Sequence, residues 1–144
     1  MKVREVMSSN PICCLPADTA EKVAKIMCQH NVGSVPVVAD QQTRKLIGII
    51  TDRDLCCSIV AGAMDPKRTS IEKFVTPSPI SCRDGENMES CERAMQERQV
   101  RRIPVVDGEG AVIGIVAQAD MVRKEKPEKA SKTIAEISRP SNAA

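Results

Sequence analysis

The chain has 144 residues, which is enough for one compact domain or for two small ones packed together. Its only aromatic residue is Phe74, so aliphatic side chains must build the core, and no aromatic platform exists for stacking nucleic-acid bases. The 21 basic and 19 acidic residues leave a net charge of +2, which argues against nucleic acid or a membrane surface as a partner.

The N-terminal sequence and the cysteines indicate the expected compartment. MKVREVMSS contains no apolar run of signal-peptide length, and no segment approaches a membrane span, so we expect a soluble cytoplasmic protein. The seven cysteines are odd in number and none is spaced C-x-x-C, so we expect most to be small buried hydrophobic residues. His30 is the only histidine, and no metal site is predicted.

In chain order, the first half of the sequence predicts five elements. PICCL predicts a strand, residues 18–31 a helix, VPVV and LIGII two buried strands joined by a hairpin loop, and the residues from Asp52 a final helix. Asp18 is a candidate N-cap of the first helix, with Glu21 three residues later. Arg44 and Lys45 lie in the hairpin loop and are expected to be surface charge.

The second half repeats the first. Three blocks occur in the same order in both copies: NPICC (10–14) and SPISC (78–82), NVGSVPVV (31–38) and QVRRIPVV (99–106), IGIITDRDL (47–55) and IGIVAQADM (113–121). The second copy therefore predicts the same elements, with its last helix starting near Ala119. Each copy is a β-α-β-β-α unit that is small for an independent core, so we expect the two copies to pack together.

Composition sets the expected boundaries. Gly62 and the Asp65-Pro66 break mark a linker, and the charged KEKPEKASK stretch follows the second copy. The expected segments are residues 1–60 for the first repeat, 61–70 for the linker, 71–124 for the second repeat, and 125–144 for a tail that is either mobile or a peripheral helix.

Thr51 and Asp54 follow the apolar strand in GIITDRDL, and two interpretations of them remain open. On these residues alone, Thr51 is an N-cap and Asp54 a first-turn acid. The alternative is that the hydroxyl and the carboxylate contact a ligand. Both roles are compatible, because the cap needs only one oxygen. In the second copy Ala117 replaces the threonine, whereas Asp120 keeps the carboxylate.

The VMSSNPICC opening, NVGSVPVV, GIITDRDL and their second-copy counterparts resemble a tandem cystathionine-β-synthase (CBS) domain pair, or Bateman module, over residues 1–124. The resemblance implies an α+β fold of two β-α-β-β-α repeats packed pseudo-symmetrically. It also implies two clefts between the repeats that hold AMP, ADP, ATP or S-adenosylmethionine. It further implies a homodimer of modules and, with no enzyme fused, a stand-alone protein that regulates an unknown target protein.

The resemblance implies two sets of ligand-contacting residues. The first ligand set is Ile49, Thr51, Asp54, Thr76, Pro79, Ile80, Ser81, Arg101, Arg102 and Ile103. The second, weaker ligand set is Ser8, Pro11, Ile12, Cys13, Gly33, Ser34, Val35 and Asp120.

The chemistry of the first ligand set suits a nucleotide. Asp54 would accept hydrogen bonds from the ribose hydroxyls, Thr51 would add a hydroxyl, and the Arg101-Arg102 pair would bring positive charge to phosphates. The second ligand set has Gly33 and Ser34 in place of the two arginines. A phosphorylated nucleotide is therefore predicted to prefer the first set.

We predict an adenosine-nucleotide-binding regulatory module without catalytic activity. An enzyme is disfavoured because the sequence contains no nucleophile–base pair, metal cluster or Gly-rich phosphate loop. One alternative is a thiol-based redox-responsive regulator, because Cys13-Cys14 and Cys56-Cys57 lie in or beside the predicted ligand strand and motif helix. The other alternative is a structural dimer whose clefts are degenerate.

Overall fold

The computed structural model describes residues 1–77 and 80–140, and the chain divides into two compact units. Unit 1 comprises Met1–Asn10, Ile80–Asp107 and Ile113–Ala144, and unit 2 comprises Pro11–Pro79 and Gly108–Val112. Both units combine a small sheet with helices, and the order helix, two strands, helix occurs in each. The predicted α+β class and the repeated element order are confirmed.

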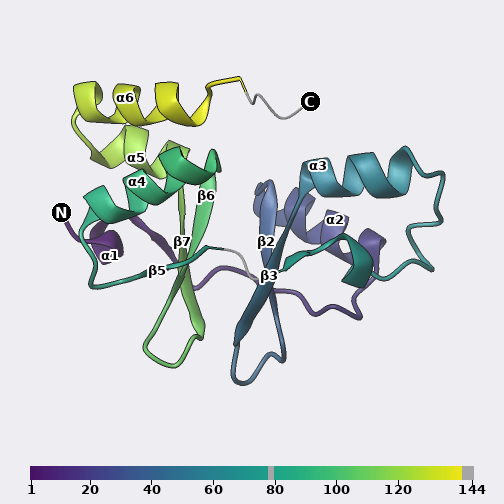
Figure 1. The fold of residues 1–144 in the computed structure, drawn as a ribbon. Helices are drawn as coiled ribbons and strands as arrows, with labels where there is room; N and C mark the ends of the chain where they lie inside the picture. The colour runs from purple at the N-terminus through teal and green to yellow at the C-terminus, as the bar shows by residue number, and fades with distance from the viewer. Residues whose placement is uncertain (78–79, 141–144) are drawn as a thin grey trace. The chain divides into compact units, whose positions relative to one another are not determined.

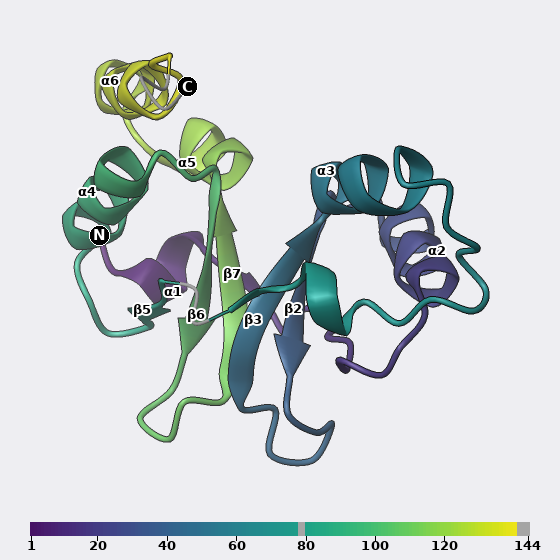
Figure 2. The same cartoon turned by 45° about the vertical axis from the view of Figure 1, so that its right-hand side comes forward.

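Unit 2 contains the helix and strands of the first repeat. Its elements are α2 (Ala20–His30), β2 (Ser34–Val38), β3 (Leu46–Thr51), α3 (Asp52–Leu55), the π-helical turn η1 (Cys56–Val60), the 3-10 turn η2 (Glu72–Phe74) and β4 (Thr76–Pro77). The sheet order is β2-β3-β4, and β2 and β3 form the predicted antiparallel hairpin (Figure 2).

The strand predicted at PICCL is reduced to one parallel bridge between Cys14 and Val37. Pro11 and Pro16 flank this segment, and proline cannot donate the N–H that a longer ladder would need. In unit 1 the equivalent segment forms a two-residue strand, β5 (Cys82–Arg83), which is parallel to its neighbour.

The N-cap of α2 is Thr19, whose hydroxyl accepts a hydrogen bond from the Lys22 N–H over 3.2 Å. The prediction of Asp18 at this position is wrong. The Asp18 carboxylate instead accepts the Leu15 N–H over 2.8 Å and pairs with the Lys22 ammonium group over 3.0 Å. Asp18 therefore closes the turn before the helix, and the next residue caps it.

Unit 1 contains the helix and strands of the second repeat together with both ends of the chain. Its elements are α1 (Val3–Val6), β1 (Ser8–Ser9), β5, α4 (Met88–Arg98), β6 (Arg102–Val106), β7 (Val112–Ala117), α5 (Gln118–Lys124) and α6 (Pro127–Ile137). The sheet order is β1-β7-β6-β5. Two alternatives were predicted for the tail, a mobile segment or a peripheral helix. The tail contains the helix α6, which packs against α4 and α5 (Figure 1).

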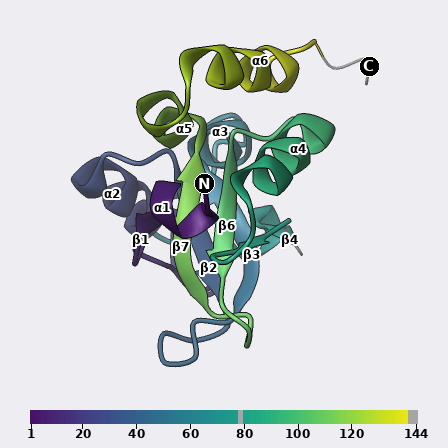
Figure 3. The same ribbon diagram turned by 90° about the vertical axis from the view of Figure 1, so that its left-hand side faces the viewer.

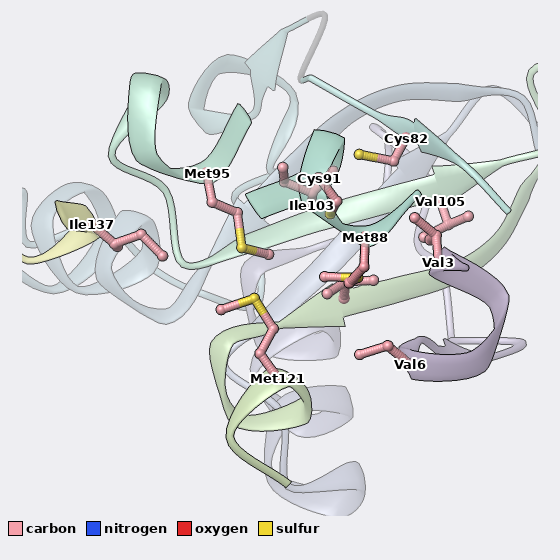
Figure 4. Packing of buried hydrophobic residues seen from close by; sticks show 11 residues of the cluster. Val3, Val6, Cys82, Met88, Cys91, Met95, Ile103, Val105, Met121 and Ile137 are labelled. Atoms are coloured by element: carbon pink, nitrogen blue, oxygen red, sulfur yellow. The ribbon is translucent and has the colours of Figure 1, made fainter. Parts of the chain in front are cut away.

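The core of unit 1 is built from sulfur-containing and aliphatic side chains (Figure 4). Met88 and Met95 of α4 and Met121 of α5 are all fully buried there. Ile137 adds the end of α6 to the same cluster. Flexible methionines fill the irregular space that a core without aromatic rings leaves.

Each unit takes its edge strand from the opening segment of the other sequence repeat. β1, at the start of the chain, pairs with β7 of the second repeat, with Ser8 opposite Ile115 (Figure 3). β4, at the start of the second repeat, pairs with β3 of the first, with Thr76 opposite Ile49. The two pairings are equivalent. Unit 1 therefore contains the opening segment of the first repeat, and unit 2 contains that of the second.

Candidate functional site

Thr51 and Asp54 lie at a strand-to-helix corner of unit 2, where β3 ends and α3 begins. The Thr51 N–H donates to Asp54 Oδ2 over 2.9 Å, and the Asp54 N–H donates to Thr51 Oγ1 over 3.1 Å. This capping box confirms the structural role of the pair. The second carboxylate oxygen, Asp54 Oδ1, has no hydrogen-bond partner among the described residues, and both side chains are half-buried.

Two further members of the first ligand set lie beside this corner. Ile49 precedes Thr51 by two residues on β3, so both side chains point to the same face of the sheet. Thr76 is exposed and lies opposite Ile49 in the β3–β4 ladder. The structure therefore brings four members of the first ligand set together within unit 2. Pro79 lies outside the described residues.

The remaining members of the first ligand set belong to unit 1. Arg101 is exposed and Arg102, the first residue of β6, is half-buried. Ile80 is half-buried against the core and Ser81 is exposed. Ile103 is fully buried in the core of unit 1, so its backbone rather than its side chain is available for a ligand contact.

In unit 1 the second ligand set contributes Ser8 and Asp120. The Ala117 N–H donates to Asp120 Oδ2 over 2.9 Å, which repeats the backbone half of the Thr51–Asp54 box. The other oxygen, Asp120 Oδ1, accepts hydrogen bonds from the Ser8 hydroxyl over 3.3 Å and from Arg123 Nη2 over 3.2 Å. The Asp120 side chain is only 10% exposed. Sequence reasoning did not select Arg123.

Unit 2 holds the other members of the second ligand set, which differ in exposure. Gly33 and Pro11 are half-buried, Ile12 is 46% exposed, and Ser34 is buried. Val35 is fully buried in the core of this unit, so only its backbone is available to a ligand.

The expectation that Arg44 is merely surface charge is wrong. Its Nη2 donates to the Pro11 carbonyl over 2.7 Å and lies 3.3 Å from Cys13 Sγ, and its Nε donates to the Val112 carbonyl over 3.2 Å. Burial raises the pKa of the Cys13 thiol, and the Arg44 charge partly opposes this shift. Arg44 thus orders the Pro11–Cys13 segment. It lies in a loop that differs between the copies, so no repeat signal marks it.

Neither a metal cluster nor a membrane span is found in the part of the chain that the structure describes. Over residues 1–77 and 80–140, no three His, Cys, Asp or Glu side chains are grouped so that they could hold a metal ion. In the same ranges, no helix is long and apolar enough to cross a membrane.

Both repeats of the chain match one known protein family. The model of the CBS domain family matches the chain twice, at residues 3–60 and 71–126. The chain belongs to the CBS domain family. The two matches correspond to the two repeats, and the strand-to-helix corners at Thr51 and Ala117 lie at equivalent positions of the two CBS domains.

Two relatives of similar length are, by name, a CBS domain-containing protein and a hypoxic response protein. The chain is 31% identical over 137 residues to the CBS domain-containing protein YhcV of Bacillus subtilis, covering 94% of both chains. It is 30% identical over 120 residues to Hypoxic response protein 1 of Mycobacterium tuberculosis, covering 83% of this chain and 82% of that one. The chain spans 63% of the longer protein MK0525 of Methanopyrus kandleri, at 30% identity.

Solved structures of CBS proteins have the same fold. Hypoxic Response Protein I with two coordinated zinc ions gives a TM-score of 0.77 at 26% identity, covering 88% of this chain and 100% of that one. CBSX2 of Arabidopsis thaliana in complex with AMP gives 0.71 at 27%, covering 93% and 98%. The CBS domain pair of protein MJ0100, in complex with 5′-methylthioadenosine and S-adenosyl-L-methionine, gives 0.75 at 28%, covering 85% and 94%.

Proposed function

We propose that this chain is a regulatory protein that binds an adenosine-containing ligand and has no catalytic activity of its own. The observation that carries the proposal is the half-buried Asp54 carboxylate, which keeps one oxygen without a partner among the described residues, beside the Thr51 hydroxyl. The adenosine compounds bound by CBSX2 and by the CBS domain pair of MJ0100 support the ligand class.

The Thr51–Asp54 corner has the chemistry that a ribose needs. A carboxylate can accept hydrogen bonds from two neighbouring hydroxyl groups, and charge-assisted hydrogen bonds are stronger than neutral ones. The capping box fixes both side chains, because each already holds a backbone N–H of the same corner. The site therefore loses little conformational freedom when it binds.

Arg101 and Arg102 give the first ligand set its preference for phosphate. Both belong to unit 1, neither residue is fully buried, and an arginine can make two-pronged contacts to phosphate oxygens. The second ligand set has Gly33 and Ser34 at the equivalent positions. The proposal therefore assigns AMP, ADP or ATP to the first ligand set and a less charged adenosyl compound to the second.

A thermal-shift panel with AMP, ADP, ATP, S-adenosylmethionine and adenosine tests this function. A ligand that binds only the folded chain stabilises it by mass action, by about 2.7 kcal/mol at a hundredfold excess over Kd. Asp54→Ala should abolish most of the shift caused by AMP or ATP, whereas Asp120→Ala should leave most of it. Asp52→Ala is the matched control, because Asp52 is an exposed acid on the same helical turn.

Three results would contradict the proposal or part of it. A panel without any stabilisation would favour the structural dimer with degenerate clefts. Turnover of ATP by the wild type that disappears in Asp54→Ala would instead identify an enzyme. Equal losses of nucleotide binding in Asp54→Ala and Asp120→Ala would remove the proposed preference for the first ligand set.

Self-association into a homodimer forms part of the same proposal. An apolar groove between α2 and η1 of unit 2 is lined by small and aliphatic side chains, including Ala24, Leu55 and Ile59. Val60, which also lines the groove, is 74% exposed, so the groove continues into an exposed apolar patch of the kind that marks interaction sites. A second copy of the chain, offering the same apolar face, would cover both.

Light scattering after size-exclusion chromatography checks the homodimer. Val60→Glu places a charge on the apolar groove and should convert a dimer to a monomer without unfolding it. Val122→Glu is the control, since Val122 lies on α5 of unit 1 and is also exposed, at 55%. A wild type that is monomeric at every concentration measured would contradict this part of the proposal.

A further inference from the structure

The two motif carboxylates, Asp54 and Asp120, have the same backbone contact and different free oxygens. In each, Oδ2 accepts the N–H of the N-cap residue over 2.9 Å, from Thr51 in unit 2 and from Ala117 in unit 1. The oxygen that remains is the one that a ribose would use. The environment of this oxygen therefore decides how readily each corner accepts a ligand.

Asp120 Oδ1 is already occupied. The Arg123 guanidinium lies 3.2 Å away, one turn along α5, and the Ser8 hydroxyl of the neighbouring strand β1 donates over 3.3 Å. All three side chains belong to unit 1, so this contact is internal to one compact unit. The carboxylate is 10% exposed, whereas the arginine side chain is 72% exposed and can move away.

Unit 2 lacks this arrangement around Asp54. The position equivalent to Arg123 is Cys57, which is exposed and carries no positive charge. The position equivalent to Ser8 is Thr76, and over the described ranges neither it nor any other side chain donates to Asp54 Oδ1. Asp120 Oδ1 thus has two contacts, from Arg123 and from Ser8, that Asp54 Oδ1 lacks, and of these only the Arg123 contact brings a positive charge.

We propose that Arg123 is a latch on the second ligand set. It holds Asp120 Oδ1 in the free protein, and a ribose diol can use this oxygen only after the guanidinium has moved aside. The inference rests on the proposed function, because it presumes that these carboxylates receive a ribose. It adds that the Arg123 guanidinium competes with a ribose for Asp120 Oδ1. The affinity of the second site for ribosyl compounds is therefore lower than it would be without Arg123, and it depends on ionic strength.

The exposure of the Arg123 side chain sets how strongly the latch should affect binding. An ion pair with one largely exposed partner contributes little net free energy, and salt weakens it. Opening the latch should therefore raise the affinity of the second site by about two- to fivefold. A role for Arg123 in binding a phosphate predicts the opposite sign, because removal of the positive charge would then weaken binding.

Adenosine, which has the ribose diol but no phosphate, is the probe that separates these roles. The titrations use isothermal calorimetry on the full chain in an Asp54→Ala background, which leaves only the second site. Arg123→Met should bind adenosine about two- to fivefold more tightly than its parent at low salt, with the difference shrinking in 0.5 M salt. Arg123→Lys should retain an intermediate latch. Unchanged melting temperatures exclude misfolding.

The reciprocal variant uses the repeat as its own control. Cys57→Arg, in an Asp120→Ala background, installs the equivalent cation beside Asp54 and should weaken adenosine binding at the first site by a similar factor. Weaker binding by Arg123→Met, or no change, would overturn the latch. So would absence of adenosine binding at the second site while the first site still binds. No adenosine binding by any form, wild type included, would overturn the proposed function as well.

Discussion

Thr51 and Asp54 cap each other across the start of α3, through two hydrogen bonds of 2.9 and 3.1 Å. Neither bond consumes the groups that a ligand would need. The Thr51 oxygen accepts an N–H but keeps its own hydrogen to donate, and Asp54 keeps the oxygen Oδ1. A helix cap and a ligand contact can therefore be the same pair of residues, doing both at once.

Removing the Thr51 hydroxyl should cost both stability and ligand binding. Thr51→Ala loses one N-cap hydrogen bond, which typically lowers the free energy of unfolding by about 1 kcal/mol. Thr51→Ser keeps the hydroxyl and should lie within a few tenths of a kcal/mol of the wild type. Urea unfolding of the three proteins measures the difference, and nucleotide titration of the same samples shows whether affinity falls with the cap.

Ala117 offers the matched test in the other repeat. This N-cap residue has no hydroxyl, although Asp120 still accepts its N–H. Ala117→Thr should supply the missing cap and raise the free energy of unfolding by about 0.5–1 kcal/mol. A destabilised Ala117→Thr would show that the surroundings of this corner, rather than the hydroxyl, decide its stability.

The helices and the hairpins were predictable from the sequence because their signals are local. Apolar residues such as Val23 and Met27 recur on one face of α2, and both are buried in the structure. The alternation around Gly48 and Gly114 marks the second strand of each hairpin. The internal repeat then doubled each signal, because the same pattern occurs twice in the same order.

The pairings between strands far apart in the chain have no such local signal in the sequence. β1 and β4 are only two residues long, and periodicity cannot mark a strand of that length or name its partner. The contact between Arg123 and Asp120 lies on one helix, but an arginine three residues after an acid is common on solvated helices. The role proposed for this contact depends on Asp120 Oδ1 and on the Ser8 hydroxyl, which only the fold brings together.

The exchanged edge strands explain the glycine in each LIGII-like strand. A Cβ on Gly48 would overlap Val75 Cγ1 and lie 2.8 Å from the Thr76 carbonyl oxygen. A Cβ on Gly114 would overlap the Met7 Sδ and lie 3.2 Å from the Ser8 carbonyl oxygen. Both glycines therefore let the edge strand approach closely, but the obstacle at Gly48 includes backbone, whereas that at Gly114 is mostly a flexible side chain.

Gly48→Ala should consequently be the more damaging of two equivalent substitutions. Overpacking of this kind costs about 1–3 kcal/mol, and a methionine can move aside at lower cost than a backbone carbonyl. Thermal unfolding should show a larger loss for Gly48→Ala than for Gly114→Ala. Equal losses would mean that the β4 segment shifts as easily as the Met7 side chain.

The cysteines should separate into two classes of reactivity. Cys28, Cys56 and Cys57 are exposed, whereas the buried thiols are Cys13, Cys14, Cys82 and Cys91. Burial, aided by neighbouring groups, raises the pKa of Cys14 to about 12, so its thiolate is scarce at neutral pH. A colourimetric thiol reagent should therefore titrate three groups quickly in the folded protein and the rest only after denaturation.

Replacing the three exposed cysteines by serine should abolish the fast phase. Among the buried thiols, Cys82 and Cys91 lie in the same core cluster, and the interaction between them lowers the pKa of the first and raises that of the second. A fourth or fifth thiol that reacts in the folded protein, lost in Cys82→Ser, would favour the redox-responsive function. A fast phase limited to the three exposed thiols would argue against a redox role for the buried thiols, and would restrict such a role to the exposed pair Cys56-Cys57.

The buried carboxylate of Glu92 should make the stability of the folded chain depend on pH. Glu92, on α4, is buried beneath α6, and its Oε1 has no hydrogen-bond partner within the described residues. Burial raises the pKa of Glu92, and Lys129 of α6, 3.7 Å from Oε2, opposes this shift only in part. Lys129 also faces Glu89 at 3.0 Å and Glu125 at 3.9 Å, so one cation is shared by three acids.

Because the pKa of Glu92 is higher in the folded chain than in the unfolded one, its contribution to stability is complete at low pH. That contribution is lost as the pH rises through the folded pKa. Glu92→Gln removes the buried charge, so it should raise the melting temperature relative to the wild type at pH 7.5, and much less at pH 4. Glu89→Gln, which removes an exposed partner of Lys129, should give no such gain. A Glu92→Gln protein that melts lower at pH 7.5 would mean that the ion pair with Lys129 outweighs the cost of burial.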